Sequence, residues 1–366
     1  MTYKIIGCPS RYIQGVGIIE NLYELVEKNG SHFLILADII VTDLLKERVE
    51  KSFAKGNKKI TWVLFNGESS PEEVARVEAI YRGNGCDAVI GAGGGKALDT
   101  AKVVANNSEG YLIIIPTIAS TDAPCSSLAV MYRDGELPTD VLLPRNPDMV
   151  LVDLEVIANA PSRLLVAGMG DAFATYYEAR ACRSSNATNM FSGLGTNSAY
   201  ELAKLSNTIL MEDGLKAKIA VENKAVTKSL ENIVETNIYL SGVGFENNGC
   251  AIAHGIYNGF STLSRKHTFL HGECVAFGTL VQLVLENENM ESIKKIQDFF
   301  FELALPLTLD DLGLGDLTEQ ELEAATLATY NNQITHNMPF DVTAKGIKDA
   351  IIATDAMGKI IKSKMA

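Results

Sequence analysis

Short apolar runs alternate with amphipathic segments through the first 160 residues, and this alternation is typical of a parallel α/β sheet. The apolar runs are rich in β-branched residues and predict strands at 32–38, 60–65, 87–93, 111–116 and 149–153. Helices are expected between them, for instance at 41–55 and 70–85, where Ser70 precedes a proline and two acids as a capping residue would. Because the strands are almost continuously apolar, we expect helices on both faces of the sheet.

After Pro161 the strand pattern stops, and long helical periods follow at 163–182, 214–245 and 274–288. The sequence therefore predicts two domains: an α/β nucleotide-binding domain over residues 1–160 and an all-helical domain over 161–366. A length of 366 residues agrees with two domains of about 150 residues or somewhat more. A small substrate is expected in the cleft between them.

The charge balance narrows the range of partners. Against 32 Lys and Arg the chain carries 45 Asp and Glu, a formal net charge of -13. Nucleic acids and anionic membranes both need a positive protein face, so neither is an expected partner. No apolar run approaches the roughly 20 residues of a spanning helix, and the N-terminal segment has none of the features of a secretion signal. We therefore expect a soluble, cytoplasmic protein.

The six cysteines are scattered along the chain and form no C-x-x-C pair. This spacing argues against a zinc ribbon, a dithiol redox site or a disulfide framework. Buried free thiols are the expected state.

A glycine-rich loop at 93–95, followed by Lys96, lies between a predicted strand and a predicted helix. Backbone N–H groups without neighbouring Cβ atoms can approach an anion closely, and a helix N-terminus adds partial positive charge, so the loop suits a phosphate or pyrophosphate. It matches neither G-x-G-x-x-G, which needs Gly in place of Lys96, nor G-x-x-x-x-G-K-[ST], which Ile90 and Ala97 break. A turn that merely lets strand and helix pack is the alternative, but three glycines followed by Lys exceed what packing requires.

Asp38 stands at the end of a predicted strand, at the sheet edge where open α/β folds bind ligands. A carboxylate there can accept both ribose hydroxyls of an adenosine and would repel a 2'-phosphate, which favours NAD over NADP. In the usual arrangement the acid follows the glycine loop by about 20 residues, whereas Asp38 precedes the loop, so the strand order must differ. A solvated helix cap is the alternative interpretation.

The segment 116–132, PTIASTDAPCSSLAVMY, places many hydroxyl groups directly after the fourth predicted strand. Ligand contacts concentrate in such loops, so these hydroxyls can hold phosphate or nicotinamide groups, and Asp122 can contact a substrate hydroxyl. An ordinary polar loop has the same composition, so the segment alone leaves both interpretations open.

Three dispersed residues of the helical half form a candidate metal site. Asp171, His254 and His271 are each expected at or near the glycine-flanked start of a helix. Two imidazoles and one carboxylate suffice for a catalytic Zn²⁺ with one position left for substrate, although spacing alone does not prove that they converge. A histidine in an apolar helix is more often a core or capping residue. Further possible ligands are His267, Glu273 and His336.

Several motifs taken together resemble a known family. GGGKALDTAK, PTIASTDAPCSSLAVMY, GMGDAFATYYEARAC, HGIYNGF, HGECVAFGTLVQLVLEN and ITHNMPF resemble, in order and over essentially the whole chain, bacterial glycerol dehydrogenases of the iron-containing alcohol dehydrogenase superfamily. The resemblance implies an N-terminal α/β nucleotide domain, a C-terminal helical metal domain of the dehydroquinate synthase-like type, and a ring-like homo-oligomer.

The resemblance also implies roles for individual residues. Asp38 would hold the adenosine ribose, and the pyrophosphate would be held by Gly94, Gly95 and Lys96. The cofactor would be lined by Thr117, Ser120, Ser126, Leu128 and Tyr132. Zinc would be bound by Asp171, His254 and His271, and the substrate polyol would be contacted by Asp122 together with these metal ligands.

Two positions depart from the family pattern. Many glycerol dehydrogenases carry a histidine three residues after the first helical ligand, where this chain has Tyr257. The iron-using branch carries a histidine four residues after the aspartate, where this chain has Thr175. The second departure favours a three-ligand zinc site, with Fe²⁺ or another divalent ion as the alternative.

The expected activity is NAD-dependent oxidation of glycerol to dihydroxyacetone by metal-assisted hydride transfer. Another small diol or hydroxyketone, such as 1,2-propanediol, is the first alternative substrate. A lyase of the dehydroquinate synthase type is a second alternative. The metal ligands of that type resemble a Glu-His-His set, whereas this chain has Asp171 in place of the glutamate, which argues against it. A non-catalytic nucleotide-binding protein is the third alternative, and the full set of metal-type residues argues against it.

Overall fold

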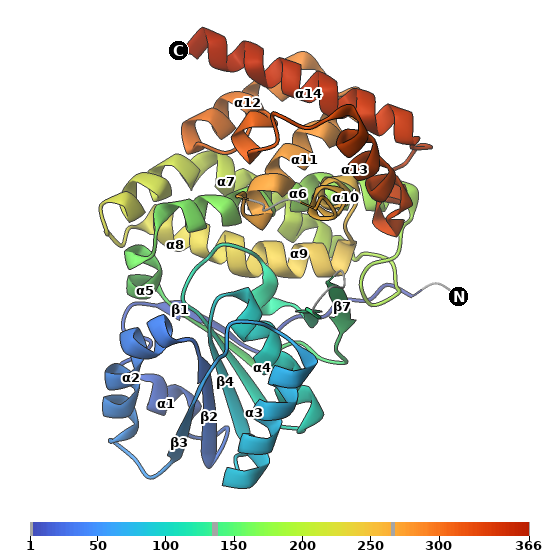
Figure 1. The fold of residues 1–366 in the computed structure, drawn as a ribbon. Helices are drawn as coiled ribbons and strands as arrows, with labels where there is room; N and C mark the ends of the chain where they lie inside the picture. Colours follow the sequence, from blue (N-terminus) through green and yellow to red (C-terminus); the bar gives the residue numbers. More distant parts are fainter. Residues whose placement is uncertain (1–2, 134–137, 265–267, 366) are drawn as a thin grey trace.

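The computed structural model describes residues 3–133, 138–264 and 268–365. Its N-terminal part is built on a six-stranded sheet of order β1-β8-β5-β4-β2-β3, in which neighbouring strands pair in parallel. Figure 1 shows this α/β part below and a helical part above it. The strands are β1 (Tyr12–Gly15), β2 (His32–Ala37), β3 (Lys59–Leu64), β4 (Ala88–Gly93), β5 (Tyr111–Pro116) and β8 (Met149–Asp153).

The five predicted strands are confirmed, with ends that agree to within one residue. Strand β1 was not predicted, because its sequence, YIQG, is short and has no apolar run. The hairpin of β6 (Leu128–Met131) and β7 (Thr139–Leu142) was also missed, since it lies in and just beyond the polar segment interpreted as a loop.

Helices cover both faces of the sheet, as the apolar strands predicted. They are α1 (Leu22–Val26), α2 (Ile39–Phe53), α3 (Pro71–Asn84), α4 (Gly95–Asn107) and α5 (Leu154–Asn159). Alternate residues of β2 point to opposite sides: Leu34 packs in the core that contains α3 and α4, whereas Phe33 packs against α1 and α2. Ser70 caps α3 by accepting a hydrogen bond from the Glu73 N–H, 3.2 Å away, as its sequence predicted.

The helical part comprises α6 (Ser162–Ser185), α7 (Asn197–Glu222), α8 (Lys228–Glu235), the π-helical turn η2 (Thr236–Leu240), α9 (Ser241–Asn248), α10 (Ile252–Ser261), α11 (His271–Leu285), α12 (Met290–Leu303), α13 (Glu319–Asn331) and α14 (Ala344–Met365). Short 3-10 turns are η1 (Ala123–Cys125), η3 (Asp310–Leu312) and η4 (Gln333–Asn337).

One predicted helical period is wrong as a continuous element. The run 214–245 is broken after α7, where Lys224 adopts a left-handed backbone with φ of 53°. A new helix, α8, then begins after Thr227, whose hydroxyl accepts a hydrogen bond from the Leu230 N–H at 3.2 Å. Apolar periodicity alone does not predict such a cap, because the capping residue is polar and lies outside the apolar repeat.

The change of architecture falls between α5 and α6, and we propose the domain division at residues 160 and 161 on that basis. Buried polar contacts join the two halves. Glu246 of α9 accepts hydrogen bonds from the N–H and hydroxyl of Ser127, each 2.6 Å away, and from the Asn146 amide, also at 2.6 Å. Within the described ranges, no helix is both long and apolar enough to cross a membrane.

The cysteines are free thiols, as predicted. Cys8 is exposed, contrary to the expectation of burial, because it lies in the extended N-terminal segment outside the regular elements. The buried cysteines are Cys86, Cys125, Cys182, Cys250 and Cys274.

Candidate active site

Asp171 lies in the interior of α6 and is 1% exposed. The expectation that it stands near a helix start is wrong, because its flanking glycines serve packing instead. A Cβ atom on Gly168 would lie 2.0 Å from the carbonyl oxygen of Ala119, and one on Gly170 would lie 2.4 Å from that of Gly272. These glycines therefore let the loop after β5 and the start of α11 approach the helix that carries Asp171.

The two histidines lie at helix starts, as predicted. His271 is the first residue of α11, and the next residue, Gly272, packs so closely that a Cβ atom there would lie 1.9 Å from the Ala167 carbonyl oxygen of α6. His254 lies in the first turn of α10. That turn is attached to α6 by Glu178, whose Oε1 accepts hydrogen bonds from the N–H groups of Ala251 at 2.8 Å and His254 at 3.0 Å.

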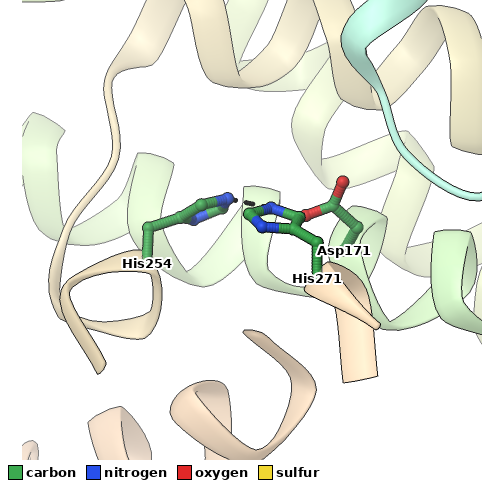
Figure 2. Close-up of side chains that lie close together, drawn as sticks. All are labelled: Asp171, His254 and His271. Atoms are coloured by element: carbon green, nitrogen blue, oxygen red, sulfur yellow. Dashed lines mark ion pairs between the residues drawn. The ribbon is translucent and has the colours of Figure 1, made fainter. Parts of the chain in front are cut away.

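Three helices thus bring one aspartate and two imidazoles together. The Nε2 atoms of His254 and His271 lie 3.5 and 3.1 Å from Asp171 Oδ1, and the three candidate ligand atoms lie within 4.8 Å of one another. Figure 2 shows the side chains converging. Ligands of a tetrahedral zinc ion lie about 3.3 Å apart, given bonds of about 2.0 Å.

The donor set also fits a cation chemically. Asp171 Oδ1 is fully buried, and within the described part of the chain it has the two imidazole Nε2 atoms nearby but forms no hydrogen bond of standard geometry. An unpartnered buried carboxylate oxygen is costly, and a cation held between it and the two imidazole nitrogens would remove that cost. Asp171, His254 and His271 therefore fit a divalent ion.

The charges of this cluster strongly influence one another. Burial tends to raise the pKa of Asp171, but the nearby imidazoles of His271 and His254 outweigh it and hold that pKa well below its usual range. For His254, burial tends to lower the pKa, yet the carboxylate of Glu178 outweighs burial and raises it well above the ordinary value. The buried carboxylates of Asp171 and Glu178 therefore stabilise positive charge on the groups beside them.

Glu178 is a further member of this cluster that the sequence did not predict. Its Oε2 lies 2.6 Å from His254 Nδ1, which we assign as the protonated ring nitrogen because a carboxylate accepts the bond. In a neutral His254 ring, that tautomer would leave the Nε2 lone pair free for a cation held beside Asp171. The available signal was spacing, since Glu178 follows Asp171 by two helical turns and so shares its helix face. Glu178, Cys250 and His254 also form a possible ligand group, but Nδ1 is already engaged there.

The other candidate ligands lie apart from this cluster. Glu273 forms an ion pair with Arg163, with Nε 2.6 Å from Oε1, and accepts the Leu270 N–H at 2.7 Å. His336 is exposed and its Nε2 lies 2.8 Å from the Tyr330 carbonyl oxygen. His267 lies outside the described residues.

Both departures from the family pattern lie next to the cluster. The ring of Tyr257 packs edge-to-face against His271, with centroids 4.2 Å apart. The hydroxyl of Thr175 lies 2.8 Å from that of Ser241, which in turn donates to Asp122 Oδ2 at 2.7 Å. In this chain Thr175 therefore contacts Asp122 indirectly, through the hydroxyl of Ser241.

Asp122 joins the cluster from the α/β part. Its N–H donates to Asp171 Oδ2 at 3.3 Å, and burial, followed by the charge of Asp171, raises its pKa well above the ordinary value. The loop that carries it is held by Asn237 of η2, whose amide donates to the carbonyl oxygens of Ala119 and Leu165 at 3.0 Å each. Such π-helical turns frequently occur at functional sites.

The predicted nucleotide residues gather at the carboxyl ends of the strands. Because β2 pairs with β4, Asp38 lies beside the glycine loop: a Cβ atom on Gly93, whose φ is 144°, would lie 4.0 Å from Asp38 Oδ2. The strand order therefore differs from the usual one, as predicted. The helix-cap interpretation holds as well, since Asp38 Oδ1 accepts the Val41 N–H at 2.9 Å.

The remaining predicted cofactor residues lie at the start of α4 and in the segment that follows β5. Lys96 Nζ lies 2.7 Å from Glu68 Oε2 and 4.5 Å from the ring centre of Tyr132. Gly94 touches the loop that leads to Asp122, since a Cβ atom there would lie 3.2 Å from Ile118. The hydroxyl of Ser126 is buried and donates to the Ala123 carbonyl at 3.1 Å, so it supports its own loop. Gly95 opens α4, Thr117 and Ser120 follow β5, and Leu128 opens β6; Thr117 is buried and the others are half-buried.

An α/β nucleotide-type domain joined to a helical domain that carries an Asp-His-His cluster fits the class of metal-dependent dehydrogenases. The chain belongs to the iron-containing alcohol dehydrogenase family, and the model of that family matches residues 9–154.

Named relatives match almost the whole chain. A glycerol dehydrogenase of Thermotoga maritima is 44% identical, with 97% of this chain and 98% of the relative covered. A glycolaldehyde reductase of Halobacterium salinarum is 40% identical, with 99% and 100% covered. The crystal structure of a probable glycerol dehydrogenase from Sinorhizobium meliloti superposes with a TM-score of 0.91 at 40% identity, covering 98% of this chain and 99% of that one.

Replacing Glu178 by glutamine tests whether it orients His254. The amide can donate to Nδ1, which would place the ring proton on Nε2 and block that nitrogen as a ligand. We expect divalent-metal affinity to fall about 10- to 100-fold, measured by metal titration and elemental analysis. Glu246→Gln is the matched control, because Glu246 is equally buried but bonds Ser127 and Asn146. Unchanged metal affinity in Glu178→Gln would remove Glu178 from this role.

Proposed function

We propose that the protein is an NAD-dependent, divalent-metal-dependent dehydrogenase that oxidises glycerol to dihydroxyacetone and acts on related vicinal diols. The observation that carries the proposal is the convergence of Asp171, His254 and His271 beside a loop that connects to the glycine-rich turn. The names of the relatives support glycerol as the substrate. A homo-oligomer and a cytoplasmic location, both expected from the sequence, complete the proposal.

Asp171, His254 and His271 would hold the metal ion. Zinc suits two imidazoles and one carboxylate, and Fe²⁺ or another divalent ion accepts the same donors. When bound, the cation lowers the pKa of the substrate's secondary hydroxyl, while the nicotinamide accepts the hydride. Glu178 keeps His254 in the tautomer that binds metal through Nε2.

The remaining roles concern binding and orientation. Asp122 contacts a second hydroxyl of the polyol, and the hydrogen bond from Ser241 fixes the direction of its carboxyl group. Asp38 holds the adenosine ribose, and the pyrophosphate lies at the start of α4, on the N–H groups of Gly94 and Gly95 with Lys96 alongside. The nicotinamide half is lined by residues of the loop and hairpin that follow β5, namely Thr117, Ser120, Ser126, Leu128 and Tyr132.

A second candidate is the reduction of a small hydroxyaldehyde. The Halobacterium salinarum relative, named as a glycolaldehyde reductase, favours it. The two activities use the same metal and cofactor, so a comparison of substrates distinguishes them.

The central test measures NADH formation with glycerol and 1,2-propanediol, and NADH consumption with dihydroxyacetone and glycolaldehyde. We expect glycerol and dihydroxyacetone to give the highest kcat/KM in their respective directions. Chelation should abolish the rate, and Zn²⁺ should restore it, because the ion stabilises the charge on the substrate oxygen. The absence of any diol-dependent rate in metal-loaded protein would refute the proposal, and a clear preference for glycolaldehyde would favour the second candidate.

Removing one imidazole separates metal binding from nucleotide binding. In His271→Ala we expect loss of bound metal and of turnover, while NADH affinity measured by fluorescence stays near that of the unmodified protein. His336→Ala is the control, since His336 is exposed and lies outside the cluster. Full metal content in His271→Ala would show that His271 is not a ligand.

Asp38→Ser tests cofactor choice with little structural change, because serine can keep the helix-capping bond to the Val41 N–H. We expect kcat/KM with NADP to rise about tenfold or more, since removing the carboxylate relieves its repulsion of the 2'-phosphate. Asp43→Ser, which removes an exposed acid from the same helix, controls for the change in net charge. An unaltered ratio of NAD to NADP activity would place the ribose elsewhere.

A further inference from the structure

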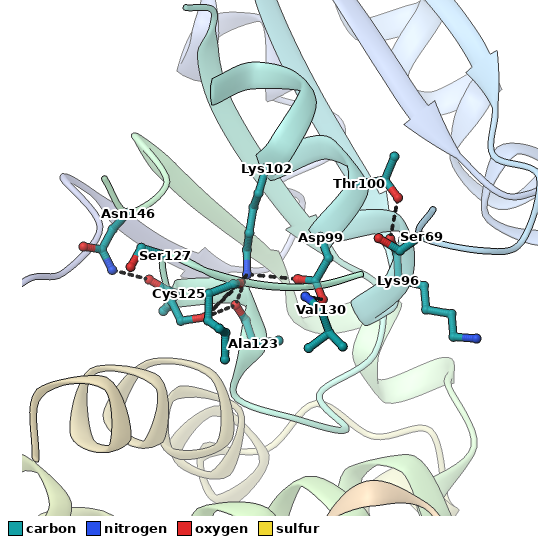
Figure 3. Close-up of polar contacts among 12 residues, drawn as sticks. Ser69, Lys96, Asp99, Thr100, Lys102, Ala123, Cys125, Ser127, Val130 and Asn146 are labelled. Carbon is teal, nitrogen blue, oxygen red and sulfur yellow. Dashed lines mark hydrogen bonds and ion pairs between the residues drawn. The ribbon is translucent and has the colours of Figure 1, made fainter. Parts of the chain in front are cut away.

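Lys102 is a lysine whose side chain is 0% exposed, a state that proteins tolerate only when the charge is compensated. Its ammonium group donates to the carbonyl oxygens of Leu128 at 2.6 Å and Ala123 at 2.8 Å, and to Asp99 Oδ1 at 3.1 Å. The Ser126 hydroxyl is a fourth, longer contact at 3.4 Å, so all three N–H donors of the ammonium group have acceptors. Figure 3 shows the side chain of Lys102 reaching from α4 to Ala123, with Asp99 of the same helix beside it.

Asp99 also forms a hydrogen bond to this segment of the chain. Its second carboxylate oxygen accepts the Val130 N–H at 3.0 Å. Asp99 and Lys102, one helical turn apart on α4, thus bind backbone groups of Ala123, Leu128 and Val130. Because the two side chains carry opposite charges, the buried pair is neutral as a whole.

Helix α4 and the segment 123–130, which Asp99 and Lys102 connect, belong to different halves of the proposed cofactor site. Helix α4 begins at Gly95, where the pyrophosphate is proposed to lie. The attached segment follows Asp122 and contains Leu128, which is proposed to line the nicotinamide. Apart from the short turn η1, the stretch between β5 and β6 has no regular structure of its own, so its position depends on side-chain bonds such as these.

We propose that Lys102, together with Asp99, is a positioning residue that fixes the nicotinamide half of the cofactor site relative to the pyrophosphate half. This inference rests on the proposed function, because it takes the two halves of the nucleotide site as described above. Lys102 touches neither cofactor nor substrate; it acts through the backbone of the segment 123–130.

A purely stabilising role makes a different prediction. A buried ion pair can often be replaced by uncharged residues of similar volume without loss of stability, whereas removal of one partner leaves an uncompensated charge. If the pair only stabilises the fold, the uncharged double replacement should restore every property. If it positions the loop, the double replacement should restore stability alone, since the bonds to Ala123 and Leu128 remain absent.

The experiment compares Lys102→Met with the double variant Asp99→Asn/Lys102→Met, in which the amide oxygen can still accept the Val130 N–H. ADP probes the adenosine and pyrophosphate half of the site, and NADH probes the whole site. The matched control is Lys216→Met, which breaks an Asp–Lys pair of the same i,i+3 spacing on the exposed surface of α7. Metal content and thermal unfolding are measured in parallel on the full-length protein.

In both Lys102 variants we expect unchanged affinity for ADP and an affinity for NADH that is about tenfold lower, the size of one lost charge-assisted contact. We expect kcat to fall about 100-fold, because a small displacement of the reacting ring slows hydride transfer. Metal content should stay as in the unmodified protein, since α6, α10 and α11 hold the ligands. Lys216→Met should match the unmodified protein throughout.

Normal NADH affinity and kcat in the double variant, or an equal loss of ADP and NADH affinity, would overturn the positioning role. If neither variant folds, the pair is a requirement of folding and the inference is also wrong. If the unmodified protein binds NADH but oxidises no diol, the proposed function fails, while the comparison of ADP with NADH still decides the role of Lys102.

Discussion

The buried carboxylate of Asp171 is the group around which the rest of the site is organised. Placed in the interior of α6 and 1% exposed, it would be strongly unfavourable without compensation. Compensation comes from His254 of α10, His271 of α11 and the N–H of Asp122. Each of these belongs to a different segment, so satisfying one carboxylate brings the helical part and the α/β part together at one point.

The sequence predicted most of the α/β fold because its strands are buried on both faces and therefore read as continuous apolar runs. It did not predict elements whose formation depends on partners distant in the chain. Strand β1 exists because β8 offers an edge to pair with, and α8 begins where Thr227 caps it within an otherwise helical period. Such features depend on local caps and on tertiary pairing, which periodicity does not encode.

The candidate site was predicted in its residue types but not in its geometry. Asp171, His254 and His271 were identified by chemistry and by resemblance, while Glu178 and Lys102 were missed. Both missed residues contact other side chains or backbone groups, so no local motif marks them, and the only signal for Glu178 was its helical spacing from Asp171. The closeness of Asp38 and the glycine loop likewise depends on the pairing of β2 with β4, which follows from strand order.

Two lysines of α4 illustrate how one helix combines exchangeable and fixed contacts. Lys96 is exposed and pairs with Glu68, and surface pairs of this kind contribute about 0–1 kcal/mol, so an incoming phosphate can displace the carboxylate at little cost. Lys102 is buried and bonded to Asp99 and to the carbonyl oxygens of Ala123 and Leu128, so releasing it would leave a buried charge without its partners. The same residue type therefore forms a weak, exposed pair at the start of the helix, where we propose that the pyrophosphate binds, and a buried set of bonds to the segment 123–130 less than two turns later.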